Sequence, residues 1–239
     1  MMSSQRVEQM MNETTWRTGP FTGKLWSDAS EIMARVRGLA FLNELAEGTL
    51  DPHTFAHYIQ QDEFYLANYS RAMAVLASRA PSGEAAEFWA GSASTAVAEE
   101  KVLHEQLLAD ERLKNIDLPE VPSATTRGYM YTLLAACAYE PYEVGAAAVL
   151  PCFWIYAQVG RELAARASAI AEHPYGRWVQ EYDDPEFAEA TQRAIDLVEQ
   201  AAEGATEKVR ERMRDVFLDA SRYEEMFWDA AYRRESWTL

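Results

Sequence analysis

From Leu25 onward the chain shows helical periodicity almost without interruption, and the interruptions are residues that start and stop helices. Asp51-Pro52 and Asp184-Pro185 each place an N-capping carboxylate before a proline at the first helical position. Gly204 ends the helix that the second pair begins. Alternating β-branched runs joined by hairpin turns do not occur. The pattern therefore predicts an all-α bundle of about eight helices.

The polar segment 1–23, with Gly19-Pro20 and Gly23 near its end, differs from everything that follows. We expect it to be a flexible or loosely docked N-terminal arm, followed by a single helical domain over residues 24–239. The expected helices span roughly residues 25–46, 52–79, 84–113, 123–139, 141–171, 174–182, 185–203 and 206–234.

The net charge is −16, from 38 acidic and 22 basic residues, which disfavours binding to nucleic acid or to an anionic membrane. The first nine residues contain no apolar leader, and no apolar run approaches the length of a membrane span. We therefore expect a cytoplasmic protein whose two cysteines, Cys137 and Cys152, are thiols.

Residues 150–156, Leu-Pro-Cys-Phe-Trp-Ile-Tyr, put a thiol beside large aromatic side chains on two helical turns. Cys152 and Tyr156 are four residues apart and face the same side. Pro151 removes an intrahelical hydrogen bond, so a kink is expected just before the thiol. Two interpretations stay open at this point: Cys152 is a nucleophile in a closed pocket, or it is a small hydrophobic residue of the core.

Two carboxylates fall on helix faces that should be buried. Asp62 shares a stripe with three tyrosines, at spacings of four, three and four: Tyr58, Asp62, Tyr65 and Tyr69. A buried Asp needs partners, which tyrosine hydroxyls, a neighbouring helix end or a ligand could supply. Glu224 shares its stripe with Phe227 and Trp228 and should face inward, whereas Glu225 should face water. An inward Glu among aromatic rings has a raised pKa and can serve as a general acid.

One thiol and two inward carboxylates on three helices suit addition of a thiolate to an electron-poor ring. A carboxyl group would hold and protonate ring or amino nitrogens, and tyrosines such as Tyr65, Tyr156 and Tyr182 would supply stacking surface and hydroxyl groups. We expect no metal and no cofactor, because Glu100 and His104 lack a second His-bearing helix to complete a metal site.

These residues resemble those of the TenA family, also called thiaminase II or aminopyrimidine aminohydrolase. The matching segments run in the family's order from about residue 25 to the end. They are Glu47-Gly48-Thr49-Leu50, Gln61-Asp62 with Tyr65-Leu66, Leu150 to Tyr156 with Val159-Gly160, His173-Pro174 with Trp178 and Tyr182, and Tyr223-Glu224 with Phe227-Trp228, Ala231-Tyr232 and Trp237.

The resemblance implies a haem-oxygenase-like helical bundle, usually a homotetramer, that hydrolyses thiamin or its aminomethyl-pyrimidine breakdown products. The product would be the hydroxymethyl-pyrimidine used in thiamin salvage. Cys152 matches the nucleophile, Glu224 the acid/base and Asp62 the carboxylate that grips the aminopyrimidine. Tyr65 and Tyr182 match pocket tyrosines, and Tyr156 and Phe227 are expected to line the same site.

The chain departs from the family pattern in two places. Leu39-Ala40-Phe41 stands where many members have His-Pro-Phe, and Thr126 falls, by register from Met130, where a pocket tyrosine is common. A Tyr-to-Thr change would open volume beside the substrate, so a substrate other than thiamin is expected; Tyr129 does not fall on that position.

Two other functions are compatible with the sequence. The same fold could be an oxidase with a metal or no cofactor, although the later helices lack the His ligands of the di-iron relatives. The chain could also bind a pyrimidine without turning it over, if Thr126 has cost a catalytic contact.

Overall fold

The computed structural model describes the backbone of residues 16–109, 112–113, 116–181 and 184–237, and their side chains except 99–109, 177, 180 and 181. Every regular element within these ranges is a helix, which confirms the all-α class. The helices are α2 (Pro20–Asp28), α3 (Ser30–Arg37), α4 (Ala40–Glu47), α5 (Pro52–Ser78), α6 (Gly83–Ala109), α7 (Ala124–Tyr139), α8 (Tyr142–Ala167), α9 (Gly176–Glu181), α10 (Pro185–Gly204) and α11 (Glu207–Tyr232).

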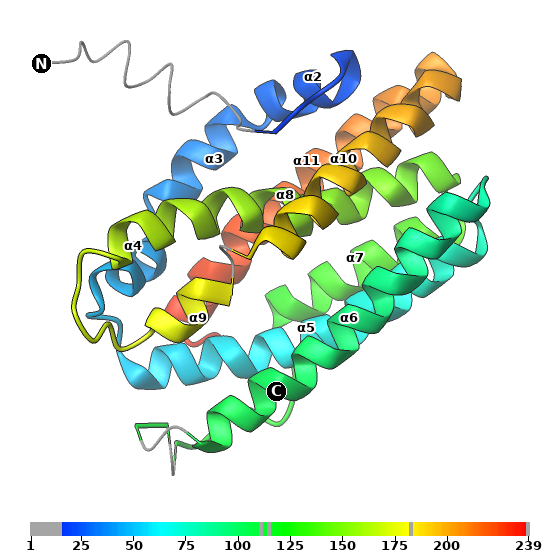
Figure 1. Cartoon of the computed structure of the whole chain (residues 1–239). Coiled ribbons are helices and arrows are strands. Elements are labelled where there is room, and N and C mark those ends of the chain that lie inside the picture. Colours follow the sequence, from blue (N-terminus) through cyan, green and yellow to red (C-terminus); the bar gives the residue numbers. More distant parts are fainter. Residues whose placement is uncertain (1–15, 110–111, 114–115, 182–183, 238–239) are drawn as a thin grey trace, which may run out of the picture.

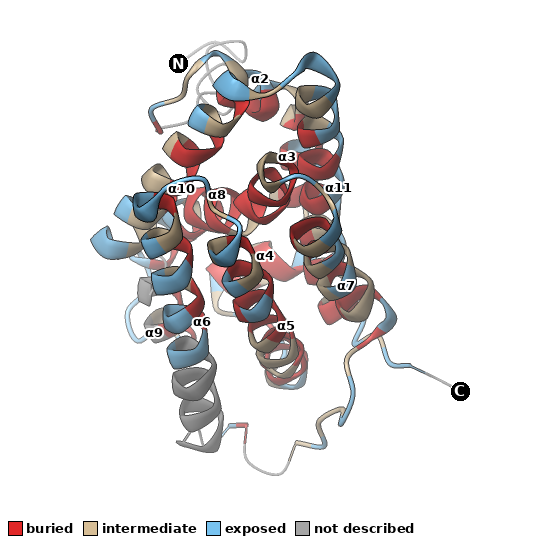
Figure 2. Ribbon diagram, turned by 90° about the vertical axis from the view of Figure 1, so that its right-hand side faces the viewer, coloured by how far each residue is buried: buried red, intermediate tan, exposed pale blue. Residues whose placement is uncertain are grey.

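Four helices, α5, α7, α8 and α11, each contact the other three and form the centre of the bundle. The long helices α5 and α6 lie side by side, and α10 packs along α8 (Figure 1). The buried faces of these helices point toward one another, while their outer faces are exposed (Figure 2). Side chains from helices far apart in the chain therefore meet in one interior.

Helix α8 is the most deeply buried of the central helices. Within the described part of the chain, it alone is long and apolar enough to cross a membrane, but 89% of its most apolar stretch is buried inside the bundle. That burial is typical of the core helix of a soluble protein. The helix continues through Pro151 without a break.

The helix starts confirm the capping signals in the sequence. Asp51 accepts a hydrogen bond from the backbone N–H of His53 at 2.7 Å, and Asp184 accepts one from Glu186 at 2.9 Å. The Ser123 hydroxyl caps α7 in the same way. A side-chain oxygen at these positions satisfies an N–H that the helix leaves unpaired, so the boundaries follow from local chemistry.

The N-terminal region differs from the sequence prediction. One helix was expected over residues 25–46, but the chain forms α2, α3 and α4, with breaks at Ala29 and at Gly38-Leu39. Leu39 is extended, with ψ of 133°, and turns the chain before α4. The breaks let three short helices wrap around α8, α10 and α11, which a straight helix could not do.

Residues 16–23 of the expected arm pack onto the helical body. Trp16 is buried, and Glu199 of α10 accepts hydrogen bonds from the backbone N–H and the hydroxyl of Thr22, both at 2.7 Å. Arg17 pairs with Asp196 at 2.6 Å. The proposed boundary at residue 23 therefore falls inside α2, and residues 1–15 lie outside the described ranges.

Candidate active site

Cys152 is the one residue between Val144 and Gly160 on α8 that is not buried. Its thiol lies among the side chains of α5, where the Tyr69 hydroxyl donates to the Val149 carbonyl at 2.9 Å, one turn before the cysteine. Cys152 therefore keeps more solvent-accessible surface than its neighbours on this helix.

The surroundings of Cys152 favour its neutral form. Burial raises the pKa of the thiol well above its ordinary value, and the negative charges of Glu224 and Asp62 raise it further. Contacts with Tyr65 and Tyr69 act in the opposite direction and lower the pKa. Both carboxylates expected from the sequence are therefore close enough to this sulfur to act on it.

Glu224 faces the interior, as its position on α11 predicted, with an exposed fraction of 1%. Glu225 points outward and pairs with Arg35 at 2.8 Å, which confirms the assignment of the two neighbouring glutamates. Burial raises the pKa of Glu224 to about 8, and the charge of Asp62 adds to the rise. The Tyr129 hydroxyl donates to Glu224 Oε1 at 2.5 Å and lowers the pKa.

The stripe expected on α5 is buried along its whole length. Tyr58, Asp62, Tyr65 and Tyr69 are each at most 5% exposed. The charge of Asp62 on α5 acts on both Glu224 of α11 and Cys152 of α8. A buried carboxylate that reaches two other ionisable groups is typical of a functional site rather than of simple packing.

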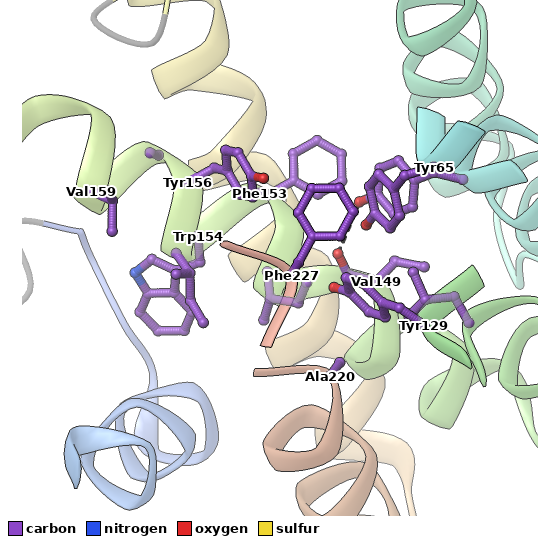
Figure 3. Close-up of a cluster of buried hydrophobic side chains, with 14 of the residues drawn as sticks. Tyr65, Tyr129, Val149, Phe153, Trp154, Tyr156, Val159, Ala220 and Phe227 are labelled. Atoms are coloured by element: carbon purple, nitrogen blue, oxygen red, sulfur yellow. Dashed lines mark hydrogen bonds between the residues drawn. The ribbon is translucent and has the colours of Figure 1, made fainter. Parts of the chain in front are cut away.

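Aromatic rings of α5, α7 and α11 contact one another in the same part of the interior. The rings of Tyr65, Tyr129 and Phe227 converge from α5, α7 and α11 (Figure 3). Tyr129 is sandwiched between Tyr65, at 5.0 Å between ring centroids, and Tyr223, at 5.2 Å and nearly parallel. Phe227 lies 5.7 Å from Tyr65. Parallel rings at these separations provide the kind of surface on which a flat heterocycle stacks.

Tyr129 is the site residue that the sequence analysis missed. Register from Met130 instead predicts Thr126 at the tyrosine position of the family. The structure places Thr126 elsewhere: its hydroxyl donates to Gln61 at 2.7 Å, at the start of α7. Tyr129, three residues later on the same helix face, contacts Glu224. The tyrosine that contacts Glu224 is therefore Tyr129, and an opening at Thr126 stays a prediction.

Two other predicted site residues have different outcomes. Tyr156 lies one turn after Cys152 on α8, where its hydroxyl is 3.3 Å from that of Tyr58 and its ring packs against Trp228. Tyr182 lies outside the described residues. In the parts of the chain whose side chains are described, no group of three or more His, Cys, Asp or Glu side chains could hold a metal ion.

The comparison with known families settles the relationship. The model of the TENA/THI-4/PQQC family matches residues 39–234, which is most of the chain. The chain belongs to this family. Its matched range contains Asp62, Tyr129, Cys152 and Glu224, so all of the residues brought together above lie inside it.

Among the curated relatives of this family member is the thiamine biosynthesis multifunctional protein ThiED of Corynebacterium glutamicum, which is 39% identical over 92% of the chain. The chain spans only 28% of that protein's length. The aminopyrimidine aminohydrolase of Bacillus subtilis is 28% identical over 83% of the chain and 84% of its own length.

Solved structures show the same fold. A TenA homologue from Pyrococcus horikoshii, 26% identical, superposes with a TM-score of 0.78 over 90% of this chain and 99% of that one. A domain from Shewanella denitrificans with a haem-oxygenase-like fold gives a TM-score of 0.64 at 10% identity, over 98% and 93% of the two chains. The haem-oxygenase-like bundle implied by the sequence is confirmed.

Proposed function

We propose that the protein hydrolyses an aminomethyl-pyrimidine to the hydroxymethyl-pyrimidine and ammonia, with thiamin as a second substrate of the same type. The observation that carries the proposal is the meeting of one thiol with two buried carboxylates. Cys152 is the one residue between Val144 and Gly160 on α8 that is not fully buried, and the charges of Glu224 and Asp62 both act on its thiol. The Bacillus subtilis relative named for this activity supports the choice of substrate.

The chemistry begins with a proton, because only the thiolate is nucleophilic. The pKa of Glu224 is about 8, so roughly a tenth of it is ionised at pH 7 and can accept the thiol proton. Sulfur then forms a bond to a ring carbon of the pyrimidine, and the displaced electron pair moves to a ring nitrogen, which takes up a proton from water and returns it when the aromatic ring is restored.

The leaving group departs from the exocyclic methylene with the electron pair of its C–N bond. Glu224, now protonated, donates a proton to that nitrogen, so ammonia leaves rather than an amide ion. Water adds to the methylene carbon and gives up a proton to the carboxylate. Return of the electrons to the ring expels Cys152 as the thiolate, and the balance is one water consumed and one ammonia released.

Asp62 and the tyrosines hold the substrate in this scheme. A carboxylate can accept hydrogen bonds from an exocyclic amino group and a protonated ring nitrogen at the same time, which fixes the ring in its plane. Tyr65 and Phe227 offer faces for stacking, and Tyr129 holds Glu224. Tyr156 and Tyr182 stay predictions as substrate contacts.

The pH dependence of kcat/KM follows from the number of protons that Cys152 and Glu224 carry together. The active form carries one proton shared by the thiol and Glu224, because one group must attack while the other donates. The acid limb of kcat/KM should therefore lie near the pKa of Glu224, about 8, with activity rising as the pH increases through it.

The test is turnover by purified protein. Aminomethyl-pyrimidine and thiamin are supplied separately, and hydroxymethyl-pyrimidine and ammonia are quantified by chromatography. We expect release of the alcohol from aminomethyl-pyrimidine by the wild-type chain and its loss in Cys152→Ala. No product from either substrate, or full activity in the variant, would exclude this function. Iron bound in stoichiometric amount would instead favour the oxidase.

The salvage role, the homotetramer and the cytoplasmic location implied by the resemblance also stay predictions. Sedimentation velocity of the full chain tests the assembly, and a mass of four chains is the expected result.

A further inference from the structure

The N-terminus of α7 is held by a side chain of α5 that has no part in the chemistry above. Gln61 is 2% exposed, and its Oε1 accepts two hydrogen bonds from α7: one from the backbone N–H of Ser123 at 2.8 Å, and one from the Thr126 hydroxyl at 2.7 Å. The Ser123 hydroxyl in turn accepts from the Thr126 N–H at 3.1 Å. We call Gln61, Ser123 and Thr126 the α7 anchor.

The orientation of the Gln61 amide is fixed by its partners. The Ser123 backbone N–H can only donate, so it must face the carbonyl oxygen of the amide and not the NH₂ group. This leaves Gln61 Nε2 buried with no acceptor among the described residues. A buried N–H donor without an acceptor is unfavourable. The two hydrogen bonds to Oε1 therefore hold the amide in an orientation that costs its NH₂ group a partner.

The anchor lies on the same helix face as Tyr129. Thr126 and Tyr129 are three residues apart, both are 1% exposed, and they follow one another along the buried side of α7. If α7 slides or rotates at Thr126, the Tyr129 hydroxyl moves with it. The hydrogen bond from that hydroxyl to Glu224, at 2.5 Å, leaves little room for such a movement.

We infer that Gln61 is a positioning residue for the proposed reaction: by fixing the start of α7 it sets where the Tyr129 hydroxyl meets Glu224. The inference rests on the proposed function for its effect on catalysis, but the hydrogen bond and its titration are properties of the resting protein. The alternative is that the ring sandwich between Tyr65 and Tyr223 holds Tyr129 without help.

Several ionisable groups act on or around Glu224 and must be kept constant in a test. They come from every helix of the site: Asp62, Tyr65 and Tyr69 of α5, Tyr129 of α7 and Cys152 of α8. None of the variants whose titration is compared with the wild type adds or removes a charge. A change in the titration of Glu224 can then be assigned to its hydrogen bond with Tyr129.

The experiment is an infrared titration of the full-length protein in D₂O. The carbonyl band of the protonated Glu224 is identified by its loss in Glu224→Gln and is followed from pH 5 to 11. The variants are Gln61→Leu, which removes the acceptor, and Thr126→Val, which removes one donor and keeps the side-chain shape. The matched controls are Thr126→Ser, which keeps the hydroxyl, and Gln60→Leu, a neighbour that bonds Glu63 instead.

We expect the titration of Glu224 to move upward by roughly half a unit to one unit in Gln61→Leu and Thr126→Val, because a weakened bond stabilises the carboxylate less. The two controls should titrate like the wild type. The acid limb of kcat/KM should move by the same amount.

An unchanged titration in folded Gln61→Leu and Thr126→Val would overturn the inference and assign the position of Tyr129 to the ring sandwich. If Gln61→Leu does not fold, the Thr126→Val and Thr126→Ser pair decides alone. If the wild-type protein turns over no pyrimidine, the proposed function is wrong. The infrared titration still tests the role of Gln61 independently, because it needs no substrate.

Discussion

The two cysteines of this bundle lie in different surroundings. Cys137 on α7 is fully buried, and its thiol donates only to the Gly145 carbonyl at 3.8 Å. Burial raises its pKa to about 12, and the nearby Arg79 lowers it only in part. Cys152 on α8 has a raised pKa for the same first reason, burial.

The two regions differ in the groups that surround each thiol. Cys152 keeps some accessible surface, and two carboxylates and two tyrosines act on its ionisation. Around Cys137, the groups that act on the thiol are the Gly145 carbonyl and the guanidinium of Arg79, which also donates to the Cys137 carbonyl. Burial alone therefore does not mark a nucleophile. What distinguishes Cys152 is that carboxylates act on its thiol and that the residue is not fully buried.

The largest expected difference between the two cysteines is in their effect on turnover. Cys152→Ala should lower kcat/KM for aminomethyl-pyrimidine by at least about 10³-fold, because it removes the attacking atom. Cys137→Ala, the matched control, should retain wild-type kcat/KM. Comparable losses in both variants would mean that the thiols act through structure and not through chemistry.

The free energy of unfolding should depend on pH through Glu224, the buried acid that acts on Cys152. The folded pKa of Glu224, about 8, lies above its ordinary 4.5, so the contribution of Glu224 is fully present below pH 4.5 and is lost as pH rises toward 8. The wild type should lose about 2–4 kcal/mol of unfolding free energy between pH 5 and 9 relative to Glu224→Gln. Urea melts at both pH values measure this. Parallel pH profiles for the two proteins would contradict the raised pKa.

Alkylation separates the thiols without any substrate. Removing the Glu224 charge should lower the pKa of Cys152, so Glu224→Gln should react with iodoacetamide at pH 9 roughly three to ten times faster at Cys152. Cys137 should react slowly in both proteins. Peptide mass spectrometry gives the two rates, and equal rates at Cys152 would show that Glu224 does not act on it.

The smallest expected effect is structural. Cys137→Ala empties a small part of the core and should cost about 1 kcal/mol of unfolding free energy. Cys152→Ala should cost less, since its side chain is already partly exposed. Denaturant midpoints of the two variants give the order, and a larger loss at Cys152 would mark it as a packing residue.

Much of the fold could be predicted from local chemistry. The Asp51-Pro52 and Asp184-Pro185 starts, the Ser123 cap and the opposite directions of Glu224 and Glu225 all appear as expected. These features depend on residues within one or two turns. The breaks at Ala29 and Gly38 depend instead on how α2, α3 and α4 wrap around other helices, which local propensity does not contain.

The site shows the same division. Cys152, Asp62 and Glu224 could be found because polar groups on apolar helix faces are visible in the sequence. Tyr129 could not, since a tyrosine on a buried face is ordinary, and only the contact between α7 and α11 gives it a partner. Thr126 was assigned to substrate on register, whereas its hydroxyl bonds Gln61 across a helix contact.

The most direct test of the account is protection of Cys152 by ligand. The wild-type protein is treated with iodoacetamide, with and without hydroxymethyl-pyrimidine, while residual turnover and labelling of each cysteine are measured together. We expect activity to fall in proportion to labelling at Cys152, with the pyrimidine slowing both and leaving Cys137 unaffected. Full labelling of Cys152 with activity intact would contradict the claim that this sulfur attacks the substrate.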